Sequence, residues 1–482
     1  MVTIKRGDDV TFGGPAAREP DRHHPAQTLP AGLVERTLGK PPSEWTEGDL
    51  VDLVFDRGIR LISLMHVGGD GWLKTLDFVP RGLSHLKDIL SGGERADGSS
   101  LFKGLGIPSG ASDIVLRPRL KTAFLDPFSE MPALVLFCGH HGRDGEPLPQ
   151  SPATILRRAH ERLRQETGTE LWALGEIEYF LGKRRAESDI YGADDRGYHA
   201  SSPFVFGEPL RRKAMAVLAE IGVPIKYGHS EVGYIEARDP DPVIWEQHEI
   251  ELALAPLPEA GRWVVLTQWV LRNLAHRSGM LCNFAPIVRE GHAGNGLHFH
   301  LSPVSNGRHV AIRNGEGALA TEAKWLIAGL VRLGASLMAF GNRAQGSFVR
   351  LSQGKEAPRA IFWGDYDRRA LIRLPIVPTA ADGRSVSPST VEFRLPDGSA
   401  HPYLLLAGVA QAMLLGRSTE RIDDLIESAS AAGARGSAGP VSPVPRHPRE
   451  VAEALIAGRA ALESGGVFPS VLIDGVLARL AS

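Results

Sequence analysis

Four segments of the chain share one pattern, in which two polar residues stand one residue apart inside an extended, mostly apolar run. On a β-strand, residues i and i+2 point to the same face, so each pair would project together from one face of a sheet. The opposite face would hold Ile177, Phe299 and Phe393. The pattern therefore predicts a sheet with one charged face. The pairs are Glu176 and Glu178 in LGEIEYFL, Gln247 and Glu249 in EQHEIEL, His298 and His300 in GLHFHLS, and Glu392 and Arg394 in VEFRLP.

A charged sheet face of this kind favours a bound cation. Carboxylates opposed on neighbouring strands repel, and burying them is costly unless a positive charge lies between them. Oxygen ligands with one imidazole suit Mg²⁺ or Mn²⁺ better than Zn²⁺. For any single pair the alternative is a solvated strand face, and HFH alone is compatible with zinc, although no Cys cluster or HExxH accompanies it. The candidate ligands are Glu176, Glu178, Glu231 in HSEV, Glu249, His298 and Glu392.

Arginine provides a second signal. Arg350, Arg368, Arg373 and Arg394 lie within one quarter of the chain. Guanidinium groups match carboxylate and phosphate oxygens, so arginines near a metal cluster indicate an anionic substrate or a transferring phosphate. Each one taken alone is more often a surface or structural arginine. The chain has no GxxxxGK[ST], no GxGxxG between a strand and a helix, and no GxSxG, which argues against P-loop, Rossmann and serine-hydrolase chemistry.

Composition excludes several classes of partner. The 482 residues include 54 Lys and Arg and 56 Asp and Glu, a formal net charge of −2, and no long run of like charges, so we expect no nucleic-acid partner. The longest apolar stretch, Tyr403 to Leu415, is shorter than the roughly 20 residues that span a bilayer. No secretory leader is recognisable, and Cys138 and Cys282 lie in apolar surroundings. These features predict a cytoplasmic protein without a membrane partner.

The domain organisation follows from changes in pattern. Residues 1–40 read as a flexible polar extension, and residues 41–138 carry short extended runs, including VDLVF at 51–55, that predict a small β-rich domain. At Ser151 and Pro152 an amphipathic helix begins, and helices and strands alternate thereafter. The simplest division places a second, α+β domain with an antiparallel sheet over 139–482. Further helices are expected over 209–221, 263–278, 320–340, 402–415 and 448–464.

The successive motifs resemble those of the glutamine synthetase family. In order they are GEIEYF, HSEV, EQHEIEL, GNGLHFHLS, FVRLSQGKEAP, RRALIRLP and VEFRLPDGSAHPYLLLAG. The resemblance implies a β-grasp N-terminal domain joined to a catalytic domain with a curved antiparallel sheet flanked by helices. It also implies two or three Mg²⁺ or Mn²⁺ ions per active site, with ATP entering at one end and glutamate at the other.

By motif position, the resemblance assigns a role to each candidate residue. Glu178, Glu231 and Glu249 would hold the metal nearer glutamate, and Glu176, His298 and Glu392 the metal at the ATP phosphates. Gly294, Arg350 and Arg394 would bind glutamate, and Arg368 and Arg373 would neutralise the γ-phosphoryl group. His300 and Ser302 would lie toward the nucleotide. Glu356 would act as proton acceptor and shield the intermediate, and Asp97 would assist from a neighbouring subunit. The resemblance thus implies a homo-oligomer, commonly a dodecamer of stacked hexamers.

The chain departs from the family pattern at several positions. The asparagine expected in N-G-x-G-x-H is Ala293, an arginine expected near the last metal glutamate is Thr390, and residues 232–246 form a longer loop than usual. No tyrosine follows Tyr403, so an adenylylation tyrosine is absent. The predicted reaction is ATP-dependent formation of glutamine from glutamate and ammonia through γ-glutamyl phosphate. The alternatives are a γ-glutamyl ligase for another amine, such as an alkylamine, ethanolamine or a polyamine, and a catalytically silent homologue.

Overall fold

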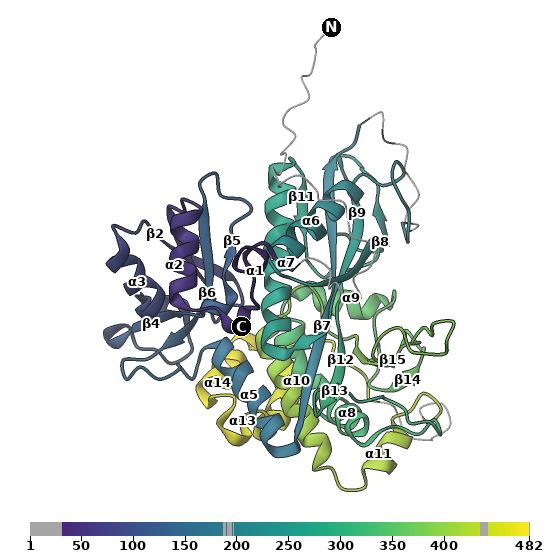
Figure 1. Cartoon of the computed structure of the whole chain (residues 1–482). Coiled ribbons are helices and arrows are strands. Elements are labelled where there is room, and N and C mark those ends of the chain that lie inside the picture. Colours follow the sequence, from purple (N-terminus) through teal and green to yellow (C-terminus); the bar gives the residue numbers. More distant parts are fainter. Residues whose placement is uncertain (1–30, 187–188, 190–194, 196, 434–441, 482) are drawn as a thin grey trace.

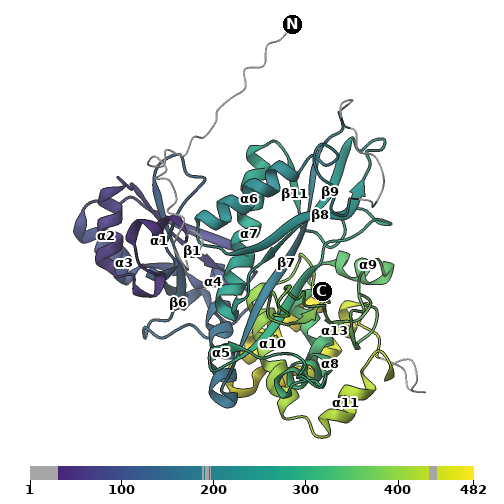
Figure 2. The ribbon, with the colours of Figure 1, turned by 45° about the vertical axis from the view of Figure 1, so that its right-hand side comes forward.

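The computed structural model describes residues 31–186, 189, 195, 197–433 and 442–481, which form two lobes (Figure 1). The extension predicted over 1–40 lies mostly outside the described residues, and its last part contains helix α1 (Leu33–Leu38). The smaller lobe follows α1, and the larger lobe contains the rest of the chain. Turning the molecule shows the long strand β7 (Thr169–Arg184) running through the larger lobe (Figure 2).

The smaller lobe is a mixed sheet covered by helices on one face. Its strand order is β2-β1-β6-β4-β3, with β5 paired to β6; β1 and β6 are parallel and the other pairs antiparallel. A core separate from that of the larger lobe lies between helices and sheet and includes Leu53, Leu86 and Leu134. β6 continues past the expected boundary at 138. The elements are α2 (Glu47–Asp56), β1 (Leu61–Val67), β2 (Leu73–Phe78), α3 (Leu83–Gly92), β3 (Glu94–Asp97), α4 (Gly98–Leu101), β4 (Asp113–Pro118), β5 (Phe124–Leu125) and β6 (Ala133–His141).

The prediction of a strand at VDLVF is wrong, because this segment lies in helix α2. Thr46 caps the helix: its hydroxyl accepts the backbone N–H of Asp49, whose carboxylate accepts the backbone N–H of Thr46. Such a reciprocal capping box is a strong start signal for a helix. Leu50, Leu53 and Val54 are buried at spacings of three and four, the period of a helix rather than of a strand.

The larger lobe is built on a curled sheet with strand order β14-β15-β16-β12-β7-β9-β8, in which all pairs except β14 with β15 are antiparallel. Ile177, Phe299 and Phe393 are almost wholly buried on the helix-covered face, as the alternating pattern predicted. Its further strands are β8 (Ile225–Ile235), β9 (Val243–Leu252), β10 (Ala255–Pro256), β11 (Leu281–Asn283), β12 (Leu297–Ser305), β13 (Arg308–His309), β14 (Trp363–Asp365), β15 (Ile372–Leu374) and β16 (Val391–Phe393).

Helices cover the apolar face of this sheet, and the five predicted over 209–464 are all present. The helix expected from Ser151 begins at Pro152 and buries Ile155, Leu156 and Leu163. Residues 434–441, between α11 and α13, lie outside the described part of the chain. The helices are α5 (Pro152–Thr167), α6 (Glu208–Glu220), α7 (Leu257–Arg277), α8 (Thr321–Gly341), α9 (Gln345–Gln353), α10 (Pro402–Arg417), α11 (Ile422–Ser428), α13 (Pro448–Glu463) and α14 (Ser470–Leu480), with 3-10 turns η1 (Pro42–Glu44), η2 (Ser109–Ala111), η3 (Leu120–Thr122) and η4 (Ser464–Gly466).

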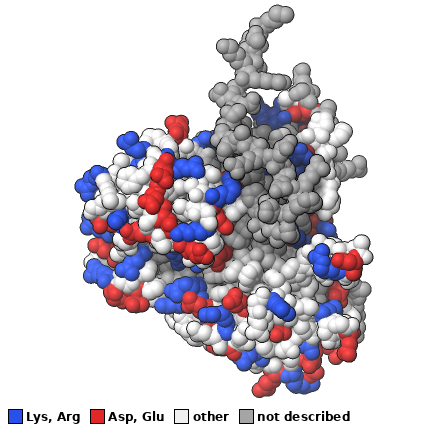
Figure 3. Space-filling view, in the orientation of Figure 1, with Lys and Arg blue, Asp and Glu red and all other residues white. Residues whose placement is uncertain are grey.

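Two surface properties bear on the predicted partners. Lys and Arg alternate with Asp and Glu over the face shown in Figure 3, with no large patch of one sign among the described residues there. Helix α8 is long and apolar enough to cross a bilayer, but 72% of its most apolar window is buried inside the lobe. A buried core helix of a globular domain has the same composition.

Candidate active site

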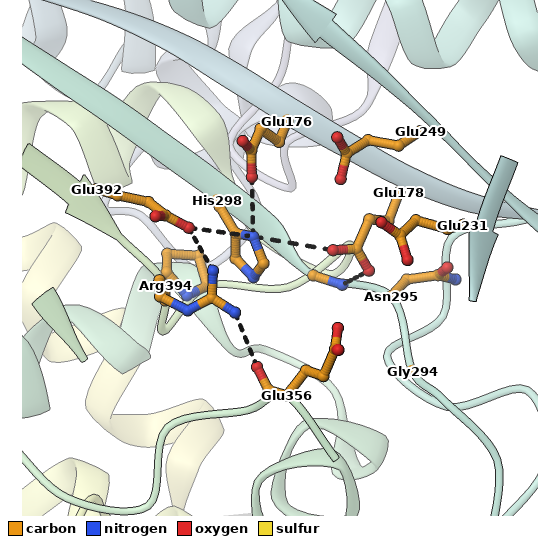
Figure 4. Close-up of polar contacts among 12 residues, drawn as sticks. Glu176, Glu178, Glu231, Glu249, Gly294, Asn295, His298, Glu356, Glu392 and Arg394 are labelled. Carbon is orange, nitrogen blue, oxygen red and sulfur yellow. Dashed lines mark hydrogen bonds and ion pairs between the residues drawn. The ribbon is translucent and has the colours of Figure 1, made fainter. Parts of the chain in front are cut away.

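Strand register brings the predicted polar pairs together on the open face of the curled sheet. Glu178 stands opposite Glu249 and Glu176 opposite Glu251 on β9, while His298 stands opposite Glu176 on β12. Glu392 on β16 pairs with His300 on one side and Arg373 on the other. Glu231 enters where β8 shifts register against β9 between Ser230 and Tyr234. The side chains therefore converge from five strands, as Figure 4 shows for the carboxylates and His298.

The converging side chains line two cavities that meet. The larger, of about 770 Å³, is lined by the carboxylates, His300, Arg368, Arg373 and Arg394. The smaller, of about 280 Å³, is lined by Ala293, Gly294 and Arg350 among others. Four residues line both cavities: Glu178, Glu231, His298 and Glu356. A reaction between ligands in the two cavities would take place beside these four.

One group of side chains, here called the acidic cluster, consists of His229, Glu231 and Glu249, whose potential ligand atoms lie within 4.8 Å of one another. Burial raises the pKa of Glu231 to about 8, and the charge of Glu178 adds to the rise. Burial, with Glu176 and Glu178, raises the pKa of Glu249 well above its usual value. Repulsion of this kind is relieved by a divalent cation, so the donors fit Mg²⁺ or Mn²⁺.

Glu178 lies beside the acidic cluster and is fixed by hydrogen bonds of its own. Its Oε2 accepts hydrogen bonds from Gln247 Nε2 at 3.0 Å and from the backbone N–H of Gly296 at 2.7 Å. Gln247 Nε2 lies 3.2 Å from Asn295 Oδ1, and Asn295 donates to two backbone carbonyls. A Cβ at Gly296 would lie 2.5 Å from His298 Nε2, so only glycine fits there. Glu178 thus reaches the junction of the cavities in a fixed orientation.

The second group, here called the arginine-braced cluster, consists of Glu176, His298 and Glu392, again with potential ligand atoms within 4.8 Å. His298 Nδ1 lies 3.1 Å from Glu176 Oε2, and Arg373 Nη1 lies 2.8 Å from Glu392 Oε2. Arg394 pairs with the other oxygen of Glu392. Burial raises the pKa of Glu392, but Arg394 together with His300 and His298 outweighs it, and the pKa is lowered. Burial likewise opposes ionisation of Glu176, yet His300 and His298 hold its pKa well below the usual value.

Three residues of the site were missed in the sequence. Glu251 joins Glu176 and His300 in a further group with ligand atoms within 4.8 Å, and its Oε1 pairs with Lys226 Nζ at 2.7 Å. Its position two residues after Glu249 was the available signal. His229 precedes Glu231 by two residues and carried the same signal. Tyr198 lines the larger cavity and helps to raise the pKa of Arg368, against burial, by a hydrogen bond; no motif spacing identifies it.

The remaining predicted residues divide into those at the cavities and those away from them. Glu356 lines both cavities with a left-handed backbone (φ 56°), and its carbonyl accepts a hydrogen bond from Arg394 Nη2 at 3.0 Å. Ser302 lines neither cavity; its hydroxyl contacts Nδ1 of His309, which does line the larger one. Asp97 is exposed at the end of β3, bonded to the backbone N–H of Ser99, and lines neither cavity of its own chain.

Comparisons with known proteins agree with this arrangement. Residues 149–474 match the family "glutamine synthetase, catalytic domain". A glutamine synthetase of Thermus thermophilus is 30% identical over 381 residues, which cover 76% of this chain and 79% of that protein. Among solved structures, the cryo-EM glutamine synthetase of Plasmodium falciparum has a TM-score of 0.75 at 18% identity, covering 91% of this chain and 95% of its own. The ligand-free structure of GmaS has a TM-score of 0.72 at 20% identity, covering 90% and 94%.

The fold and the match over most of the catalytic lobe support a ligase enzyme, in a family known for its use of ATP and divalent metal. The chain belongs to the glutamine synthetase family.

Proposed function

We propose that the protein joins ammonia to the γ-carboxylate of L-glutamate at the expense of ATP, forming L-glutamine through γ-glutamyl phosphate. The observation that carries this proposal is the meeting of two different charged clusters at one junction. An acidic cluster without an internal counter-charge suits a metal and a cationic amine, and an arginine-braced cluster suits phosphate. A reaction that phosphorylates a carboxylate and then replaces the phosphate by an amine needs both kinds of site.

The residues fit the metal that the family uses. We assign Glu178, Glu231 and Glu249 to an ion on the glutamate side and Glu176, His298 and Glu392 to an ion on the phosphate side. Bound Mg²⁺ or Mn²⁺ would offset charge on the phosphate oxygens during transfer. A third ion has donors available at Glu251 and His300.

The first step we propose is attack of a γ-carboxylate oxygen of glutamate on the γ-phosphorus of ATP, which releases ADP. Arg350 and Gly294 hold the amino-acid end in the smaller cavity, and Arg394 lies near the reacting carboxylate. Arg368 and Arg373 offset the charge that develops on the equatorial phosphate oxygens. His300, and Ser302 through His309, orient the nucleotide side.

In the second step the amine nitrogen attacks the acyl carbon and inorganic phosphate leaves. Ammonium is not a nucleophile, so a carboxylate must accept its proton first. Glu356 lines both cavities and is assigned this role, together with exclusion of water from the acyl phosphate. Asp97, exposed in its own chain, is assigned to the active site of a neighbouring subunit, which makes a ring-shaped homo-oligomer, such as a dodecamer, part of the proposal.

A γ-glutamyl ligase for a larger amine is the second candidate function. It is favoured by Ala293, which places a methyl group in the smaller cavity where the family has an amide. The structural similarity to GmaS, a γ-glutamylmethylamide synthetase, also favours it.

The deciding experiment measures ADP release with Mg²⁺, ATP and glutamate, supplied with ammonia or with methylamine, ethanolamine or putrescine. The proposal expects the highest kcat/KM with ammonia. Turnover confined to a larger amine would replace it by the second candidate, and absence of turnover with every acceptor would indicate a catalytically silent homologue. Glu178→Ala serves as the matched inactive control, because it removes a metal ligand at the junction while the strand remains paired.

A further inference from the structure

A third cavity, of about 230 Å³, lies between the two lobes and shares no lining residue with the cavities of the active site. The smaller lobe contributes Arg119 and Phe137 to its wall. The larger lobe contributes Arg262 from α7 and Tyr403 from α10. We call it the seam pocket. Its residues take no part in the proposed reaction, so their chemistry needs a separate explanation.

The charges that line the seam pocket do not balance. Its two carboxylates each have a neighbouring base: Glu161 lies 3.2 Å from Arg157 Nη1, and Glu259 lies 3.9 Å from Lys121 Nζ. Among the described residues, the guanidinium groups of Arg119 and Arg262 have no carboxylate within ion-pair distance and donate no hydrogen bond. Two positive groups therefore face one small cavity without an anion.

The surroundings make this imbalance costly. Arg262 lies over the ring of Phe137, with its guanidinium carbon 5.9 Å from the ring centroid. Burial lowers the pKa of Arg262; Glu259 and Tyr403 offset this only in part, and Arg119 lowers the pKa further. Burial raises the pKa of Tyr403 to about 12, so its hydroxyl keeps its proton and remains a donor. Arg119 and Arg262 are both half-buried, and cations drawn partly out of water normally have a paired anion.

We propose that the seam pocket binds a small anion carrying phosphate or carboxylate oxygens, held by the guanidinium groups of Arg119 and Arg262 and by the Tyr403 hydroxyl. One guanidinium group can donate two parallel hydrogen bonds to two oxygens of the same anion. This geometry selects carboxylate and phosphate groups over halide ions. The volume is below the roughly 300 to 1,000 Å³ typical of sites for drug-sized ligands, so the ligand is a small metabolite or inorganic ion rather than a nucleotide.

The position of the pocket indicates what such an anion would do. Arg119 precedes η3 in the lobe that carries Asp97, whereas Arg262 lies on α7, which packs against β7 and thus against the strand of Glu176 and Glu178. An anion bridging the two arginines would tie the lobes together. Because binding to the folded state stabilises it, the anion would raise the unfolding temperature of the whole chain.

Isothermal titration calorimetry on the full chain tests the proposal, with inorganic phosphate and citrate as probes. Mg²⁺ and a non-hydrolysable ATP analogue are kept saturating, so that Arg368 and Arg373, which we assign to the γ-phosphoryl group, are occupied. We expect one saturable site for at least one probe, and its preference distinguishes a phosphate ligand from a carboxylate ligand. Arg262→Gln and Arg119→Gln should each weaken binding about tenfold or more. Arg449→Gln, which removes a surface arginine from α13, is the control and should bind as the parent does.

The proposal is overturned if neither probe shows a saturable site, or if the affinity is the same in Arg262→Gln as in Arg449→Gln. The unfolding temperature measured without anion distinguishes a role of Arg262 in anion binding from a role in stabilising the fold. The proposal expects Arg262→Gln to leave it unchanged or higher, since an unpaired charge is removed, while the anion-induced rise disappears. Should Arg262→Gln not fold, the partly exposed Arg119→Gln gives the same comparison. Binding is measured without turnover, so the result is independent of the proposed function.

Discussion

The acidic cluster and the arginine-braced cluster lie on the same sheet and share the same residue types, yet they reach electrical balance in opposite ways. In the arginine-braced cluster, Glu392 is paired with Arg373 and Arg394, and its pKa is lowered. In the acidic cluster, Glu231 and Glu249 have raised pKa values, with burial as the largest cause. His229, their nearest base, has a pKa lowered by burial, which makes it a poor cation.

This difference indicates that arginines of the chain already offset part of the charge in one cluster, whereas the other depends on an external cation alone. Desolvation and repulsion oppose folding at the acidic cluster, and a bound metal would reverse that penalty. In the arginine-braced cluster Glu392 is already paired with two arginines, so a phosphate arriving there meets oriented donors. The two clusters should therefore respond to mutation, pH and metal with opposite signs.

The largest expected effect is on catalysis after Glu249→Gln. The variant loses a metal ligand, and we expect kcat/KM to fall by about a thousandfold or more, which corresponds to about 4 kcal/mol. The unfolding temperature of the metal-free protein should stay level or rise, because the amide relieves repulsion without changing shape. Enzyme assays and calorimetry at matched Mg²⁺ concentrations measure both. Near-normal turnover would show that Glu249 holds no essential ion.

Glu392→Gln should also abolish turnover, but with the opposite effect on stability. Removing this carboxylate leaves Arg373 and Arg394 without their shared partner, and breaking a buried ion pair in this way costs about 3–5 kcal/mol. Denaturant unfolding in EDTA, with Glu249→Gln as the paired control, compares the two clusters directly. Equal stability of the two variants would contradict the asymmetry between the clusters.

The next effect in size is the pH dependence of stability without metal. The folded-state pKa of Glu231 is about 8, above its ordinary value of 4.5. Between these values the folded chain binds a proton that the unfolded chain lacks, so stability should fall as pH rises through this window. Saturating Mg²⁺ should reduce or reverse this fall, because the ion binds the ionised form. Unfolding in EDTA and in Mg²⁺ between pH 5 and about 8.5 measures the difference. A metal-free curve that rises over this window would be incompatible with the assignment.

Much of the sheet could be predicted from the sequence, because the i, i+2 pattern determines which side chains share a face of one strand. Ile177 and Phe299 are buried, and Glu178 and His298 lie on the open face, as this rule requires. Which side chains of two neighbouring strands lie opposite each other depends on the strand register, and the sequence of one segment does not determine it. The opposition of Glu176 and Glu251 was therefore not predicted, although each residue lies in a recognised segment.

Elsewhere in the chain, the local sequence led to a wrong prediction or to none. VDLVF has strand-like composition, but the capping box at Thr46 and the packing of Leu50 and Leu53 favour a helix. Tyr198 reaches the cavity only because its loop folds back over β8, an effect of tertiary structure. Arg119 and Arg262 of the seam pocket come from different lobes and could not be associated from sequence spacing.

The smallest expected effect concerns Lys355, whose contacts hold the loop of Glu356 beside the acidic cluster. Lys355 Nζ lies 2.8 Å from Asp195 Oδ2 and 2.5 Å from the Gly291 carbonyl oxygen, so it pins the residue before Glu356 to the wall of the smaller cavity. Lys355→Met should let water reach the acyl phosphate more often.

The measurement is the ratio of ADP release with glutamate alone to ADP release with glutamate and ammonia. We expect this ratio to rise by at most about fivefold in Lys355→Met, because a half-exposed ion pair contributes about 1 kcal/mol or less. Lys324→Met, which breaks the Lys324–Asp423 pair on the outer surface, is the matched control and should leave this ratio unchanged. If the ratio is unaltered in Lys355→Met while kcat/KM falls, Lys355 contributes to substrate binding rather than to exclusion of water. The protection of the intermediate would then depend on Glu356 and a neighbouring subunit.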